Sequence, residues 1–246
     1  MKITDLDVSF ENNLVLSRLS FELDPGSVVG LIGPSAGGKS TLMKILGKVY
    51  QADSGEVDFG EVQDCDVSLM FQEGALFDSI SVFDNVVFPL VDGNVPIARL
   101  AQSKRSEVTE KVAWILNRVG LLNAAFKMPA QISGGMRRRV SLARALVSNP
   151  RVALLDDPTA GLDPVASSVI MELILELHNL SKPTTIIVSH DLRRLLPVCD
   201  KVMALFHGSI VFNGPVSDLI SAPTEVQEFV ACRYDLKPES EYSKLS

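Results

Sequence analysis

A loop at residues 33–41 constrains this chain more than any other feature of its sequence. It reads Gly-Pro-Ser-Ala-Gly-Gly-Lys-Ser-Thr and fits the pattern GxxxxGK[ST]. An apolar run at 27–33 precedes it and helical spacing at 41–47 follows, which is the strand–loop–helix context of a phosphate-binding loop. Glycines let backbone N–H groups point inward at phosphate oxygens, and the helix adds the positive end of its dipole. With strand and helix both predicted, a chance glycine-rich turn is the weaker interpretation.

Several polar side chains in and near this loop are candidates for nucleotide chemistry. Lys39 is expected to reach the β- and γ-phosphates, and Ser40 to offer its hydroxyl to Mg²⁺. The apolar stretch 151–155 ends in Asp156 and Asp157, and an enzyme with such a loop needs an acid at the end of a neighbouring strand to hold Mg²⁺. Alone, this stretch would be a strand followed by a solvated turn. Beside the loop, it favours Asp156 as a magnesium ligand.

A second anion-binding geometry is predicted at residues 132–136, Ile-Ser-Gly-Gly-Met, just before a helix that begins near Arg137. Backbone N–H groups and a hydroxyl at a helix N-terminus bind anions. Serine is also a common N-cap, and the sequence supports that simpler role for Ser133 equally well.

Composition excludes several classes of protein. With 23 basic and 30 acidic residues the net charge is −7, which argues against broad electrostatic binding to nucleic acid. Three cysteines without metal-ligand spacing argue against a disulfide framework or a zinc site and fit a reducing cytosol. No signal segment is expected, since two acids stand near the start. The most apolar stretch, 75–100, contains three aspartates and two prolines, so it is not expected to span a membrane.

The pattern along the chain predicts an α/β fold. Strands are expected at 3–10, 19–23, 27–33, 67–71, 152–155, 184–188, 202–206 and 210–212, and helices at 41–47, 164–180 and 191–198. Alternating strands and helices indicate a largely parallel sheet covered on both faces. The helical spacing between about 74 and 150 indicates an insertion between two sheet-forming halves. We expect a single domain over 1–232 and a polar tail over 233–246.

Together these motifs resemble those of the ABC-type ATPases, in family order and over roughly residues 3–230. The resemblance implies a P-loop NTPase fold with a mixed sheet, an antiparallel N-terminal β part and an inserted helical subdomain. It identifies 33–41 as the Walker A loop, 154–157 as Walker B and 132–136 as the signature motif. The implied ATP ligands are Gly33, Pro34, Ser35, Ala36, Gly37, Gly38, Lys39, Ser40 and Thr41, and, from a second subunit, Ser133, Gly134, Gly135 and Met136.

The resemblance also assigns roles to residues that mean little alone. Gln72 resembles the Q-loop glutamine that touches Mg²⁺, beside Ser40 and Asp156. Asp163 matches the D-loop, and His190 matches the switch histidine of the family. His190 would act in catalysis together with Lys39 and Asp157.

Phe10 stands where the family places an aromatic ring that stacks on adenine, although a phenylalanine on a strand is usually core. His190 has its own simpler reading, as a neighbour of the next helix N-cap.

Two positions depart from the family pattern. Asp157 stands where a glutamate usually polarises the attacking water, and it is shorter by one methylene, about 1.5 Å. Because general-base catalysis depends on hydrogen-bond geometry, we expect hydrolysis to persist but to be slow. The alternative is a nucleotide-gated module that binds ATP and dimerises with little hydrolysis. The second departure is Met136 in place of the usual glutamine.

Ser-Gly-Gly-Met followed by basic residues, together with 71–77 and 81–86, is similar to the subgroup that energises Mce-protein lipid transport, the Mla-type systems. This implies an ATPase subunit that drives phospholipid transport across the bacterial envelope, from the cytoplasmic face of the inner membrane. Its implied partners are a second copy in a head-to-tail ATP sandwich and a permease in a groove near Phe77, Ile80 and Phe83. A small regulatory subunit and an Mce-type periplasmic protein are further implied partners.

Overall fold

A computed structural model of the chain describes residues 1–232 except 12, 61–65 and 73, so the predicted tail lies outside the described residues. The strands are β1 (Lys2–Phe10), β2 (Asn13–Glu22), β3 (Val28–Ile32), β4 (Ser54–Asp58), β5 (Val67–Met70), β6 (Val152–Asp156), β7 (Thr184–Val188), β8 (Lys201–Phe206) and β9 (Ser209–Pro215). The α-helices are α1 (Lys39–Leu46), α2 (Val82–Val87), α3 (Gln102–Arg118), α4 (Gly134–Leu146), α5 (Pro164–Ser181), α6 (Leu192–Leu195) and α7 (Thr224–Ala231).

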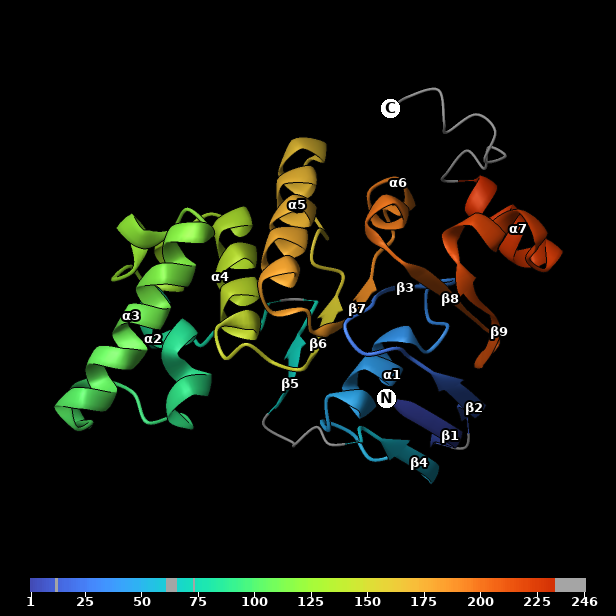
Figure 1. Cartoon of the computed structure of the whole chain (residues 1–246), viewed down its shortest axis with the longest axis horizontal. Coiled ribbons are helices and arrows are strands. Elements are labelled where there is room, and N and C mark those ends of the chain that lie inside the picture. The colour runs from blue at the N-terminus through green and yellow to red at the C-terminus, as the bar shows by residue number, and fades with distance from the viewer. Residues whose placement is uncertain (12, 61–65, 73, 233–246) are drawn as a thin grey trace.

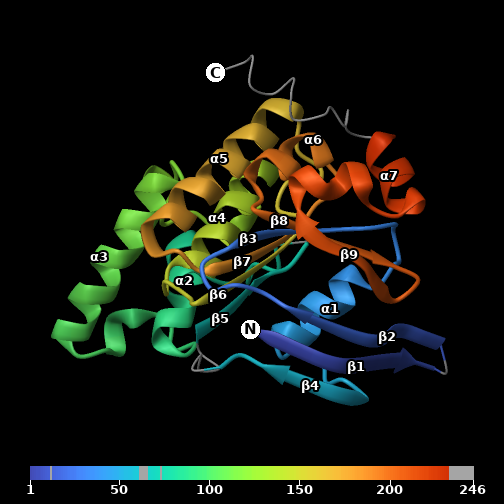
Figure 2. The ribbon, with the colours of Figure 1, turned by 45° about the vertical axis from the view of Figure 1, so that its right-hand side comes forward.

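A six-stranded sheet in the order β5-β6-β7-β3-β8-β9 forms the centre of the molecule (Figure 2). Its strands run parallel from β5 to β8, and β9 pairs antiparallel with β8. Every residue of β3, β6 and β7 is buried. Such continuously apolar strands are typical of a parallel sheet that is covered on both faces.

One face of this sheet is covered by α1 and by a smaller antiparallel sheet, β2-β1-β4 (Figure 2). The shared core on this side includes Leu19 from β2, Leu42 from α1 and Leu154 from β6. The antiparallel N-terminal part and the mixed central sheet were both predicted, and both are confirmed.

The other face carries α5, α6 and an arm of helices formed by α2, α3 and α4 (Figure 1). The arm lies between β5 and β6 in the sequence, so it is an enlarged crossover between two adjacent parallel strands. Val112 of α3, Val140 of α4 and Leu155 of β6 belong to one continuous apolar core. The helical arm is therefore packed against the sheet, as an inserted subdomain should be.

Some elements differ from the sequence-based expectation for physical reasons. The polar strand β4 pairs only with β1 at a sheet edge and shows no apolar alternation to predict it. β2 is longer than expected, since register shifts against β1 break its alternation. The helix expected at 191–198 is shortened to α6, and a 3₁₀ turn follows at Leu196–Val198, where Pro197 lacks a backbone donor. Among the described residues, none of the helices is long and apolar enough to cross a bilayer.

Candidate functional site

The loops after four neighbouring parallel strands bring the predicted chemistry together. Gln72 follows β5, Asp157 follows β6, His190 follows β7, and the loop 33–41 follows β3. The carboxyl ends of parallel strands meet at one edge of a sheet, where ligands bind in open α/β folds. The sheet order thus places residues that are distant in sequence at one site.

The phosphate-binding loop is curled tightly against the sheet. Gly33 has φ 145°, and a Cβ at this position would lie 2.1 Å from the carbonyl oxygen of Leu205, so only glycine fits. Lys39 is 6% exposed, and its Nζ donates to the carbonyls of Gly33 at 2.9 Å and Pro34 at 2.7 Å. The ammonium is therefore held inside the curve of the loop.

Helix α1 begins directly at this loop, with Gly38 as its N-cap in the left-handed region. Glycine has no side chain that could accept hydrogen bonds from the first N–H groups of the helix. These donors and the positive end of the helix dipole form a phosphate-binding end.

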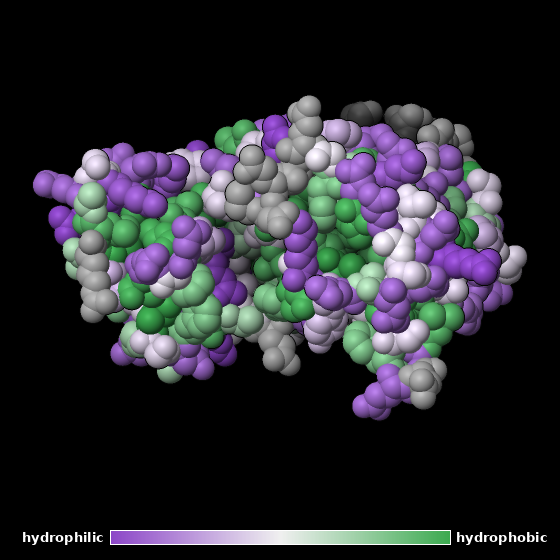
Figure 3. All heavy atoms as spheres, turned by 90° about the horizontal axis from the view of Figure 1, so that it is seen from below, coloured by the Kyte–Doolittle hydropathy of each residue, from purple (hydrophilic) through white to green (hydrophobic). Residues whose placement is uncertain are grey.

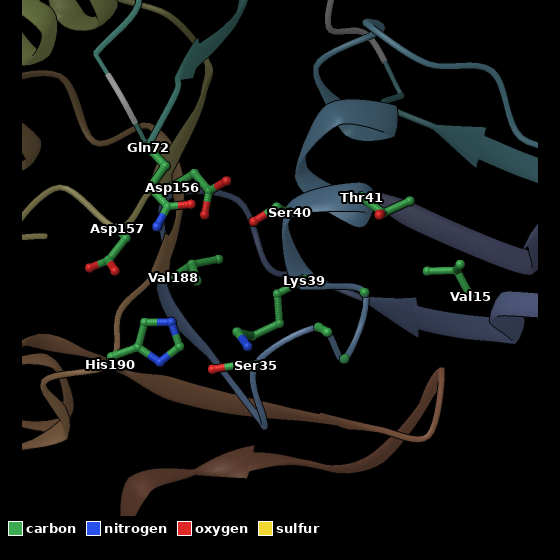
Figure 4. A pocket seen from close by; sticks show the side chains of 13 residues that line it. Val15, Ser35, Lys39, Ser40, Thr41, Gln72, Asp156, Asp157, Val188 and His190 are labelled. Atoms are coloured by element: carbon green, nitrogen blue, oxygen red, sulfur yellow. The ribbon is translucent and has the colours of Figure 1, made fainter. Parts of the chain in front are cut away.

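A cavity of about 450 Å³ opens beside the loop (Figure 4). It is lined by Val15, Ser35, Ala36, Gly37, Gly38, Lys39, Ser40, Thr41, Gln72, Asp156, Asp157, Val188 and His190. Most of the residues predicted for nucleotide and metal binding therefore share one cavity, whose volume lies in the range of small-molecule sites.

The side chains at one end of the cavity fit Mg²⁺. The Ser40 hydroxyl hydrogen-bonds to Asp156, and Gln72 lies beside them (Figure 4). Hydroxyl, carboxylate and amide oxygens are ligands of the hard kind that Mg²⁺ prefers. Across the described residues, three or more His, Cys, Asp or Glu side chains are nowhere grouped as a metal site. A magnesium ion held here would complete its coordination with water and with phosphate oxygens of the nucleotide.

Asp157 and His190 line the cavity on the same side as Asp156 and Gln72 (Figure 4). Burial raises the pKa of Asp157, and the nearby charges of His190 and Arg138 oppose this rise. Asp157 has φ 46°, and its backbone N–H donates to the carbonyl of Val188 at 3.0 Å. This hydrogen bond fixes the backbone position from which the carboxylate side chain extends. Asp157 and His190 also line a second hollow of about 570 Å³, together with Gly161.

Burial of the Asp157 carboxylate predicts a pH-dependent cost in stability. Its raised pKa means that the folded chain binds the proton more tightly than the unfolded chain, so stability falls as pH rises from about 4 through that pKa. Asp157→Asn removes this cost, and asparagine also tolerates the left-handed backbone. We expect Tm at pH 7 to rise in Asp157→Asn, because the cost of burying the ionised carboxylate is removed.

Thermal melts between pH 4 and pH 8 test this prediction, with the exposed Asp218→Asn as the matched control. The gain for Asp157→Asn should shrink toward pH 4, while the control should melt like the wild type throughout. A gain that is equal at every pH would show that ionisation of Asp157 is not its cause.

The signature residues lie elsewhere in the chain. Ser133 is exposed and caps α4, accepting a hydrogen bond from the N–H of Met136 at 3.2 Å. Asp163 caps α5, and its Oδ1 accepts from Val165 and Ala166. None of the residues 133–136, nor Asp163, lines the cavity within the same chain.

Phe10, which is predicted to stack on adenine, lies outside the set of residues that line the cavity. Its ring meets that of Tyr50 edge-on with ring centroids 5.7 Å apart. Val15 of β2 lines the cavity instead, as does Val188 of β7. Neither valine could be found from sequence, since a single valine on a strand carries no chemical signal. Stacking of adenine on Phe10 stays a prediction.

Comparison with known proteins decides the family. Residues 16–160 match the family described as "ABC transporter". The chain belongs to this family. As an ABC ATPase it binds ATP with Mg²⁺ and hydrolyses it, and its fold is that of ABC cassettes.

The relatives of this ABC ATPase carry names that refer to different functions. Methionine import ATP-binding protein MetN of Carboxydothermus hydrogenoformans is 33% identical over 87% of this chain and 66% of its own length. Protein TRIGALACTOSYLDIACYLGLYCEROL 3, chloroplastic, of Arabidopsis thaliana is 36% identical over 94% of this chain and 73% of its own length. This ABC ATPase therefore spans about two thirds to three quarters of the length of these two relatives.

Solved structures share the fold. cbiO1 from Clostridium perfringens, part of the ABC transporter complex cbiONQ, is 27% identical, covers 94% of each chain and has a TM-score of 0.75. The dimeric cassette MJ0796 bound to ADP and Pi has the same TM-score at 24% identity, over 87% of this chain and 98% of its own. The second match shows the fold alone.

Proposed function

We propose that this ABC ATPase works as a head-to-tail pair in which each ATP is enclosed by one chain's cavity and the other chain's signature motif. The observation that carries this proposal is the separation of the two anion-binding ends. The loop 33–41 lines the cavity, whereas Ser133 and Gly134 stand exposed at the start of α4. A second copy would bring the exposed helix end, with its N–H donors, to the γ-phosphate.

Exposed apolar side chains on the helical arm favour a membrane permease as a further partner. Apolar side chains reach the surface over the helical arm (Figure 3). Phe126 is 87% exposed and Phe77 is 42% exposed, and Trp114 and Leu122 add further apolar surface. Exposed apolar patches of this kind are typical of interaction sites. Phe77 lies five residues after Gln72, so a helix of the permease docked here would sense the metal end of the site. Such docking would hold the chain at the cytoplasmic face of the membrane.

We assign phospholipid, or a related apolar molecule, as the cargo. The signature Ser-Gly-Gly-Met with its basic continuation supports this assignment, as does the relative that is named after a galactolipid. A periplasmic Mce-type protein and a small regulatory subunit belong to the same assignment. The competing cargo is a small polar solute, favoured by the relative named for methionine import.

Transport by the complex purified from native membranes with this chain tests the cargo. In proteoliposomes, ATP should drive transfer of a fluorescent phospholipid, and a complex carrying Lys39→Met should show none. Uptake of labelled methionine or sulfate without lipid transfer would contradict the lipid assignment. Mass spectrometry of the same complex identifies its permease and any smaller subunits.

A further inference from the structure

Two side chains of α4, Ser141 and Arg144, hydrogen-bond to the backbone just after Gln72, and together these bonds form a grip on it. The carbonyl oxygen of Gly74 accepts from Ser141 Oγ at 2.9 Å and from Arg144 Nη2 at 2.8 Å. Arg144 Nη1 donates to the next carbonyl, that of Ala75, at 2.9 Å. A carbonyl oxygen has two lone pairs, so Gly74 is fully engaged. The planar guanidinium fork matches two consecutive carbonyls in a way that a single ammonium cannot.

The same segment makes further contacts with side chains of the arm at Phe77. The guanidinium of Arg144 lies 5.7 Å from the ring centroid of Phe77, a cation–π contact. Asn85, fully buried in α2, accepts from the N–H of Phe77 at 2.8 Å and donates to its carbonyl at 3.0 Å. Gly74, Ala75 and Phe77 are therefore tied to the arm by side chains of α4 and α2.

The position of this grip connects two parts of the site. Gln72 lines the nucleotide cavity only two residues before Gly74. Ser141 and Arg144 are three residues apart on α4, so they share one face of the helix. The other end of α4 is capped by Ser133 of the signature motif. One helix thus holds the chain beside Gln72 and presents the signature to a second copy.

We propose that Arg144 and Ser141 are positioning residues that set Gln72 against the magnesium end of the cavity. Neither side chain lines the cavity, so they act through the backbone of Gly74 and Ala75. Because the grip joins Gln72 to α4, a shift of the signature helix moves Gln72 with it. The inference rests on the proposed role of Gln72 as a magnesium contact and on the proposed pairing of signature and nucleotide.

Arg144→Met tests the grip, with Arg118→Met as the matched control on the same arm. Arg118 pairs with Glu176 and lies over the ring of Trp114, and neither contact involves the segment 74–77. We expect Arg144→Met to accelerate hydrogen exchange in the peptide 71–80. It should also raise the Mg²⁺ concentration for half-maximal ATP binding by about tenfold, the scale for residues that orient metal ligands. Arg118→Met should change neither quantity.

A double variant separates positioning from a general loss of structure. Gln72→Ala alone should raise the Mg²⁺ requirement, and Gln72→Ala with Arg144→Met should raise it no further, since Arg144 acts through Gln72. Independent, multiplying effects would overturn the proposal, and so would an unchanged Mg²⁺ requirement in a folded Arg144→Met. Ser141→Ala removes one of the two bonds to Gly74 and should shift both readouts less, in the same direction. Ser141→Ala serves as the test variant if Arg144→Met does not fold.

The two proposals can fail separately. Hydrogen exchange of the peptide 71–80 is measured on the single chain without nucleotide, so it reports the grip whether or not the signature of a second copy completes the site. A normal grip in a protein that fails to pair would contradict the proposed function alone. A pairing, active protein whose 71–80 exchange is unaffected by Arg144→Met would contradict the inference alone.

Discussion

Lys39→Met is expected to lower ATP turnover by at least about 100-fold, the scale for removing one donor that stabilises developing charge. Lys39 is held inside the loop by two carbonyls, and its ammonium points into the cavity where the phosphates bind (Figure 4). Methionine keeps the volume of the stem but supplies no charge. A steady-state phosphate-release assay with saturating ATP and Mg²⁺ measures the effect.

The control for this variant is Lys111→Met. Lys111 is half-exposed on α3 and pairs with Glu107 one turn away, an interaction worth about 0.5 kcal/mol at most. We expect wild-type turnover from the control. Turnover that survives in Lys39→Met at more than a tenth of the wild-type rate would show that the phosphates do not bind at this loop.

Asp157→Glu is expected to raise turnover by roughly 10- to 100-fold, because a displacement of about 1 Å at a reacting centre can cost about 100-fold. The backbone of Asp157 is fixed by its hydrogen bond to Val188, so the chain does not move to make up for the missing methylene. Space for the longer side chain exists, since Asp157 borders both the cavity and the second hollow.

Asp156→Glu serves as the matched comparison for this prediction. It lengthens the neighbouring carboxylate, which is hydrogen-bonded to Ser40, and should therefore disturb the magnesium end and lower turnover. Opposite signs at adjacent positions would support the two assigned roles. An unchanged or lower rate in Asp157→Glu would mean that the aspartate already reaches the attacking water.

The same pair of variants measures how far the shorter side chain of Asp157 slows hydrolysis. A wild type with slow turnover that Asp157→Glu accelerates is the slow ATPase that the shorter side chain predicts.

Parts of the site that depend on local chain geometry could be predicted from the sequence. The loop 33–41 needs glycine at fixed spacing, and the buried strands β3, β6 and β7 are short and rich in apolar residues. These patterns predict where the strands end, and therefore that Lys39 and Asp156 lie close together. The polar edge strand β4 gave no such pattern.

Parts that depend on long-range contacts could not be predicted. Ser141 and Arg144 bind Gly74 from 67 and 70 residues away, and each looks like an ordinary residue of an amphipathic helix. Val15 reaches the nucleotide cavity through the register of β2, which irregular pairing with β1 determines. Local pattern alone therefore predicts the phosphate and metal contacts better than the groups that position them.

The most direct test of the pairing is complementation between two inactive variants, Lys39→Met and Ser133→Ala. In a mixed head-to-tail pair, one site has both defects and the other has intact Lys39 and Ser133. Each variant alone should be nearly inactive, and an equal mixture should recover roughly a quarter of the wild-type rate. This follows because half of the pairs are mixed and each mixed pair has one intact site. A mixture no more active than its separate components would contradict the shared site.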